Sequence, residues 1–214
     1  MLRYDVGVQN VTAFVLTGGR SSRMGADKAL LLFREQTLLA RALQVAWAVA
    51  GKVVIVGPGE RYAAYGDVVE DVYPGCGPLG GIHAALSATQ TELNLVLSVD
   101  MPLMSHEFPG WLLGQARGTC DLIVVPVALG GQQPLCAVYR RPVGTLAEQA
   151  LKNGDYKVGH LFSRAPTRYI SVAEMGEAGF SPGIFRNVNT AAEYEALLLE
   201  DGAAVAKGKG SAGG

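Results

Sequence analysis

The sequence is poor in charge and in cysteine, and both shortages exclude classes of function. Only 17% of its 214 residues are charged, and the formal net charge is −1. A balance this close to neutral provides no field for holding nucleic acid or an anionic membrane surface. Cys76, Cys120 and Cys136 are odd in number and far apart, which excludes a disulfide framework and a zinc site and fits a reducing compartment.

Long hydrophobic runs are also missing. No apolar stretch approaches the roughly 20 residues that span a bilayer. The first ten residues, MLRYDVGVQN, carry charges and lack the apolar segment of a secretory signal. We therefore expect a cytoplasmic protein with no membrane partner and no nucleic-acid partner.

Short apolar segments are present and alternate with helical patterns. Strands are expected at 12–17, 52–56, 93–99, 122–127 and 134–139, the last two separated by the turn-rich LGGQQ. Apolar residues at helical spacing follow Thr37, which can cap a helix that Gly51 can end, and the glycine-rich YPGCGPLGG opens another helix. This order predicts an α/β fold, a three-layer αβα sandwich with a mostly parallel sheet. We expect one domain over 1–205 and a flexible tail over 206–214.

The segment LTGGRSSRMGADKALL directly follows the first expected strand. It is not a Walker loop, because Lys28 is followed by Ala29 and no Gly-Lys-Ser/Thr occurs. It is not a dinucleotide-binding loop either, because Gly18–Gly19–Arg20 does not match the pattern G-x-G-x-x-G. Glycines at this position let a ligand approach the backbone N–H groups. Arg20, Arg23 and Lys28 are cations that suit phosphate oxygens. The segment therefore indicates a polyphosphate site, and a solvated basic loop is the alternative.

Two further polar positions stand out. Asp100 comes just after the apolar strand 93–99, where open α/β sheets bind ligands, and a carboxylate there suits Mg²⁺. A turn-capping role is the alternative for this residue. Asn187 and Asn189 are two apart, so an extended backbone points both to one face, where they can reach substrate or metal. Local turn hydrogen bonds are the alternative for the asparagines.

Several motifs together resemble a known family. LTGGRSSRMGADK, VVEDVYPGCGPLGGIHAAL, VLSVDMPLM, QQPLCAVY and NVNTAAEYEAL follow in order and cover nearly the whole chain. They resemble the molybdenum cofactor guanylyltransferases, which belong to the nucleotidyltransferases of Rossmann-like, glycosyltransferase-A-like fold. The resemblance implies an enzyme that transfers GMP from GTP to molybdopterin with Mg²⁺ as cofactor and releases pyrophosphate. It also suggests molybdoenzyme-maturation proteins as partners.

The resemblance suggests roles for individual residues. Asp100 would hold the metal, Lys28 would neutralise phosphate charge, and Arg23 would be a second clamp. The nucleotide-binding positions would be Leu16, Thr17, Gly18, Gly19, Lys28, Asp71 and Asp100, and the acceptor-binding positions Asn187 and Asn189. Gly57 departs from the family pattern, which often has a polar side chain there to contact the base.

Other functions remain open at this point. The cytidylyl version of the reaction and transfer to a sugar phosphate are close alternatives, although the glycine pair Gly18–Gly19 and the dipeptide Asp27–Lys28 resemble the guanylyl branch more. A non-catalytic nucleotide-binding module is a more distant alternative. Retention of both Lys28 and Asp100 argues against it, because a module that only binds could have lost either.

Overall fold

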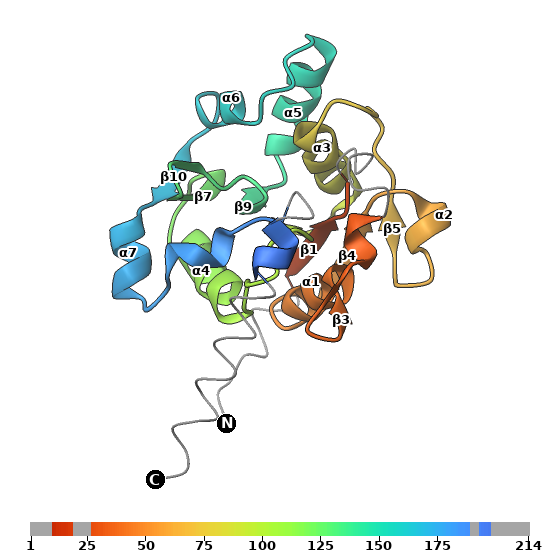
Figure 1. The fold of residues 1–214 in the computed structure, drawn as a ribbon. Helices are drawn as coiled ribbons and strands as arrows, with labels where there is room; N and C mark the ends of the chain where they lie inside the picture. The colour runs from red at the N-terminus through yellow and green to blue at the C-terminus, as the bar shows by residue number, and fades with distance from the viewer. Residues whose placement is uncertain (1–9, 19–26, 189–192, 198–214) are drawn as a thin grey trace.

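The computed structural model describes residues 10–18, 27–188 and 193–197, and their fold is the expected three-layer αβα sandwich (Figure 1). The central sheet has the strand order β10-β7-β9-β6-β1-β4-β5, with β8 paired to β7. Helices cover both of its faces. The expected tail at 206–214 lies outside the described residues.

The middle of the sheet is parallel and buried. β1 (Val11–Leu16) lies between β4 (Lys52–Val56) and β6 (Leu93–Ser98), in parallel register with both. All six residues of β1 are buried. Continuous apolar strands are typical of parallel sheets covered on both faces, which is why these three strands were predicted to within a residue. The short edge strand β5 (Val68–Val69) extends the parallel region beyond β4.

The other half of the sheet contains its antiparallel strand. β9 (Cys136–Arg140) runs antiparallel to both β6 and β7 (Ile123–Ala128), and β10 (Thr167–Ile170) is parallel to β7. The turn-rich segment before β9 forms a hairpin, in which β8 (Gly131–Gln132) pairs back onto β7. Leu129 and Gly130 make its turn with φ of 52° and 83°.

Two long helices cover each face of the sheet (Figure 1). α1 (Leu38–Trp47) and α4 (Glu107–Arg117) pack on one face, and α3 (Pro78–Ala88) and α5 (Val143–Lys152) on the other. The shorter elements are η2 (Lys28–Leu30), β2 (Leu32–Phe33), β3 (Gln36–Thr37), α2 (Gly59–Tyr62), α6 (Gly159–Phe162), α7 (Val172–Glu177) and η3 (Pro182–Phe185). Within the described ranges, no helix has the length and apolar character that crossing a bilayer requires.

The predicted start of α1 is confirmed and its predicted end is wrong. Thr37 Oγ1 accepts a hydrogen bond from the Ala40 N–H at 3.1 Å, as an N-cap does. The helix ends at Trp47 and not near Gly51, because the N–H groups of Val49 and Ala50 both bond back to the Ala46 carbonyl and close the last turn.

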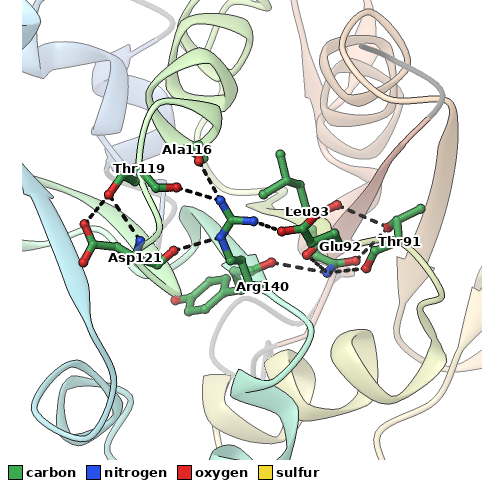
Figure 2. A network of polar contacts seen from close by, with 9 residues as sticks. Thr91, Glu92, Leu93, Ala116, Thr119, Asp121 and Arg140 are labelled. Carbon is green, nitrogen blue, oxygen red and sulfur yellow. Dashed lines mark hydrogen bonds and ion pairs between the residues drawn. The ribbon is translucent and has the colours of Figure 1, made fainter. Parts of the chain in front are cut away.

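A polar network ties together the edge of the molecule where β6 and β7 begin. Figure 2 shows Arg140 of β9 donating to the carbonyl oxygens of Ala116, Thr119 and Asp121 at 3.0, 2.8 and 3.0 Å. The same guanidinium pairs with Glu92, just before β6. One side chain therefore joins β9 to the end of α4 and to the segments that lead into two strands.

Candidate active site

The carboxyl ends of the three central strands meet at one point. The Thr17 N–H and Oγ1 both donate to the Val56 carbonyl, at 3.1 and 2.9 Å, and the Val99 N–H donates to the Leu16 carbonyl at 3.1 Å. These bonds hold the segments that leave β1, β4 and β6 side by side. The residues that follow the strands are consequently presented together at one edge of the sheet, the place where α/β sheets bind ligands.

Lys28 and Asp100 form an ion pair at this edge. Lys28 Nζ lies 3.1 Å from Asp100 Oδ2, and the two side chains are 13% and 16% exposed. Asp100 lies two residues beyond β6, and Lys28 is the first residue of η2. The structure thus brings together two residues that the sequence suggested for separate tasks, phosphate neutralisation and metal binding. A cation and a carboxylate side by side can bind, respectively, the negative phosphate oxygens of a ligand and a metal cation that accompanies them.

Asp27 fixes the turn that carries Lys28. Asp27 Oδ1 accepts a hydrogen bond from the Ala29 N–H at 3.1 Å, which makes it the N-cap of η2. The hydroxyl of Tyr62, on α2, lies 2.9 and 2.8 Å from the two carboxylate oxygens of Asp27. Sequence reasoning missed Tyr62, since no local pattern links it to a residue 35 positions away. Asp27 carried a detectable signal, because an aspartate just before a short helical turn is a typical cap.

Gly57 has a steric reason to be glycine. A Cβ at this position would collide with Thr17 Oγ1 and lie 3.0 Å from Cε2 of Tyr62. The side-chain contact to the base that the family pattern suggests at this position is therefore replaced here by close packing of the Thr17 and Tyr62 side chains against the backbone.

Asp71 and the glycine-rich turn lie together beside β1. Asp71 Oδ1 accepts from the Tyr73 N–H at 2.8 Å, and a Cβ on Gly80 would lie only 2.5 Å from Asp71 Oδ2. A Cβ on Gly81 would lie 2.9 Å from Cδ2 of Leu16. Desolvation in this half-buried position raises the pKa of Asp71. The glycines allow the first turn of α3 to approach both predicted nucleotide-binding residues closely.

The remaining predicted residues differ in what the structure shows of them. Asn187 is exposed, and the N–H of the next residue, Val188, donates to the Asp100 carbonyl at 2.9 Å, so this segment is joined to the backbone of Asp100. Gly18 is exposed directly after Thr17. Gly19, Arg23 and Asn189 lie outside the described residues.

The donor set at this edge fits a metal that is shared with phosphates. Among the described residues no group of three or more His, Cys, Asp and Glu side chains comes together. Asp100 offers two carboxylate oxygens at this edge, of which Oδ2 lies 3.1 Å from Lys28 Nζ. Magnesium is commonly held in this way, by one or two carboxylates plus substrate phosphate oxygens.

The mostly parallel sheet and the position of this edge are those of an α/β enzyme, and the family that the chain matches makes it an enzyme of the nucleotidyltransferase class. The chain belongs to the MobA-like NTP transferase domain family, which it matches over residues 13–168.

Individual relatives agree with this assignment. A protein of Carboxydothermus hydrogenoformans named as a probable molybdenum cofactor guanylyltransferase is 32% identical over 193 residues, which are 89% of this chain and 96% of that protein. The crystal structure of molybdopterin-guanine dinucleotide biosynthesis protein A from Archaeoglobus fulgidus has the same fold, with a TM-score of 0.75 at 23% identity over 86% of this chain and 95% of that one. A Mycobacterium tuberculosis protein solved in complex with manganese matches with a TM-score of 0.59 at 19% identity over 89% and 98%.

Proposed function

We propose that this protein transfers GMP from GTP to molybdopterin, releasing pyrophosphate and forming the molybdopterin guanine dinucleotide cofactor. The observation that carries the proposal is the Lys28–Asp100 pair at the carboxyl edge of β1 and β6, in a chain that resembles a named guanylyltransferase over most of its length. A product of this kind would then pass to molybdoenzyme-maturation proteins.

The reaction asks the protein for positioning and charge stabilisation more than for covalent chemistry. An oxygen of the pterin phosphate attacks the α-phosphorus of GTP, and the bond from that phosphorus to the bridging oxygen breaks. The electron pair of that bond leaves with pyrophosphate. Lys28, whose Nζ lies 3.1 Å from Asp100 Oδ2, is proposed to donate to the phosphate oxygens on which this charge develops. Arg23 is proposed as a second phosphate clamp.

Asp100 is proposed as the residue that holds Mg²⁺. When bound, the metal would supply positive charge to the phosphates and a template for their orientation. The similar fold that was solved with manganese supports a divalent cation in this class of protein. The Asp100 carboxylate lies 3.1 Å from Lys28 Nζ, so the proposed metal ligand and the proposed phosphate ligand are neighbours.

The nucleotide is proposed to lie along the end of β1. Guanine has a donor edge and an acceptor at O6, so a selective site must present both acceptors and donors. The Leu16 carbonyl and the Thr17 N–H are already bonded to Val99 and Val56, so the contacts to the base are proposed for the Thr17 carbonyl and the backbone of Gly18 and Gly19. Asp71 lies beside Leu16 through the first turn of α3 and is proposed to contact the nucleotide from that side.

The acceptor is proposed to bind on the side of Asn187 and Asn189. The hydrogen bond from the Val188 N–H to the main-chain carbonyl of Asp100 supports this for Asn187, because it joins the segment to the residue that is proposed to hold the metal. A pterin phosphate bound to this segment would lie close to Asp100 and so to the proposed position of the α-phosphate.

The decisive experiment supplies molybdopterin, Mg²⁺ and each of the four nucleoside triphosphates separately and measures pyrophosphate release. We expect GTP to be used several powers of ten better than the others, because a site built to hydrogen-bond one base leaves buried polar groups unpaired with another. A parallel reaction with a sugar 1-phosphate in place of molybdopterin tests the acceptor. Equal or better use of CTP, or transfer to the sugar phosphate alone, would contradict the proposal.

A further inference from the structure

The Tyr62 hydroxyl lies between two residues that flank the glycine- and arginine-rich segment. On one side both oxygens of the Asp27 carboxylate are within 2.9 Å of it. On the other side the Thr17 side chain is its polar neighbour. Thr17 directly precedes the glycine pair and Asp27 directly precedes Lys28. One phenol from α2 therefore contacts the chain both before and after this segment.

The Tyr62 side chain is held more rigidly than the Asp27 carboxylate that it contacts. Its side chain is 2% exposed, and its ring packs against the backbone at Gly57, where even a Cβ would be crowded. The short helix that carries it is anchored at its first residue, since the Gly59 N–H donates to Glu70 Oε1 at 2.7 Å. Asp27 is 20% exposed and has Arg61 as a distant partner at 3.8 Å. The tyrosine is thus the rigid member of the contact.

The phenol is a permanent donor in this position. Burial, followed by the hydrogen bond to Asp27, raises the pKa of Tyr62 to about 12. At neutral pH the hydroxyl is therefore protonated and can donate a hydrogen bond to one Asp27 oxygen. Oδ1 of the same carboxylate also accepts a hydrogen bond from the Ala29 N–H.

We propose that Tyr62 is a positioning residue for nucleotidyl transfer, acting through Asp27 to hold Lys28 at the phosphate site. The contacts run in series: Tyr62 orients the Asp27 carboxylate, the carboxylate caps η2, and the cap fixes where Lys28 leaves the backbone and hence where Nζ lies relative to Asp100. The inference rests on the proposed function, because it assumes that Lys28 stabilises charge on the nucleotide.

The test compares Tyr62→Phe, which removes only the hydroxyl, with Tyr65→Phe, a matched change at a tyrosine that is 46% exposed on the same segment. Tyr62→Phe should lower kcat about tenfold with little change in KM for GTP, since small displacements of a charge-stabilising group act on the transition state. Tyr65→Phe should have no effect. Thermal melting of both variants shows whether the fold is retained.

A double-mutant cycle separates positioning from general stabilisation. Lys28→Ala alone should lower kcat by a factor on the order of 10². If Tyr62 acts through Lys28, adding Tyr62→Phe to Lys28→Ala should cost nothing further, whereas a merely structural tyrosine would cost the same in both backgrounds. Equal costs in the two backgrounds, or no effect of Tyr62→Phe in wild type, would overturn the inference and leave the proposed function standing.

A second readout needs no catalysis. Reaction of lysines with an amine-selective reagent, followed by peptide mass spectrometry, should show Lys28 modified severalfold faster in Tyr62→Phe, with the exposed Lys52 unchanged as internal control. An unchanged Lys28 rate would overturn the inference even if no GTP-dependent activity were found. Normal transfer by Lys28→Ala would instead refute the proposed role of Lys28, and the positioning role of Tyr62 with it.

Discussion

Asp100 lies just beyond β6, with its carboxylate 3.1 Å from Lys28 Nζ and its carbonyl bonded to the Val188 N–H. Its backbone is therefore part of the framework, and its side chain is the part available for chemistry. A substitution that changes only the Asp100 side chain therefore tests its chemistry and leaves the backbone contact in place.

Asp100→Asn should remove most of the turnover and leave the fold intact. The amide keeps the shape of the side chain and loses the negative charge, so we expect kcat to fall by about 10² to 10³, the scale of losing one electrostatic stabiliser. Pyrophosphate release measures the rate, and thermal melting checks the fold. Asp67→Asn, at an exposed aspartate, is the matched control. Near-normal turnover in Asp100→Asn would exclude this carboxylate from the mechanism.

His83 predicts a pH dependence of stability. It is buried in α3, its Nε2 lies 3.2 Å from Ser87 Oγ, and its Nδ1 has no hydrogen-bond partner among the described groups. Desolvation lowers the pKa of His83 below the ordinary 6.5, although Glu148 and Asp71 act in the opposite direction. Between these two pKa values the unfolded chain binds a proton that the folded chain does not. The stability contribution is therefore complete above about pH 6.5 and is lost as the pH falls below it.

Urea unfolding of wild type and His83→Phe at pH 5.5 and 7.5 tests this prediction. The aromatic replacement keeps the edge-on contact with Tyr73 and cannot be protonated. We expect wild type to lose free energy of unfolding relative to the variant as the pH is lowered. A difference between the two proteins that stays constant with pH would contradict the prediction.

Sequence reasoning at the residue scale found the groups with distinctive chemistry. Lys28 and Asp100 were predicted because a cation in a glycine-rich segment and a carboxylate after an apolar strand stand out in one dimension. Tyr62 could not be predicted in this way, since its importance comes entirely from a contact with Asp27. Free cysteines usually pack in the core, and Cys136 does, whereas Cys120 is exposed.

At the scale of elements, Arg140 provides the clearest test of what joins helix to sheet (Figure 2). Its side chain, 16% exposed, supplies donors to three carbonyl groups at the end of α4 and before β7. Arg140→Met keeps most of the apolar stem and leaves these carbonyls without their donors. We expect the free energy of unfolding to fall by about 2 kcal/mol, the scale of losing hydrogen bonds from a charged donor to part-buried carbonyl groups.

The same substitution should spare catalysis. Arg140 pairs in register with Leu93, at the start of β6, whereas Asp100 follows the end of that strand. The two lie roughly 20 Å apart along the strand direction. The kcat of folded Arg140→Met should therefore stay within about twofold of wild type. Arg141→Met, at the exposed neighbouring residue, should change neither quantity. A large loss of kcat without loss of stability would refute this separation.

For the whole molecule we propose that residues 1–205 form one cooperative domain. The two hydrophobic clusters lie on opposite faces of one sheet, and the same strands contribute to both: β1 gives Val15 to one and Phe14 to the other. Neither face can be lost while the other keeps its packing surface, so unfolding should be a single transition.

Urea titration followed by far-UV circular dichroism and by tryptophan fluorescence tests this cooperativity. Trp111, which packs against Phe108 on α4, and the more exposed Trp47 at the end of α1 both report the face covered by α1 and α4, while circular dichroism reports all helices. We expect coincident midpoints. Two separated transitions would contradict a single domain.

The sequence by itself predicted the three central strands, the strands at 122–127 and 134–139 and the starts of α1 and α3, and it suggested which side chains could meet phosphate and metal. Both depend on local patterns: apolar runs, glycine turns, caps and the charge of single residues. The tertiary structure decided which of them meet. The parallel pairing of β6 with β1 brings Asp100 beside Lys28, and the packing of α2 brings Tyr62 beside Asp27. These contacts join residues 72 and 35 positions apart. No local preference of the chain distinguishes these pairs from other possible pairs. They are selected by the packing that buries both faces of the sheet.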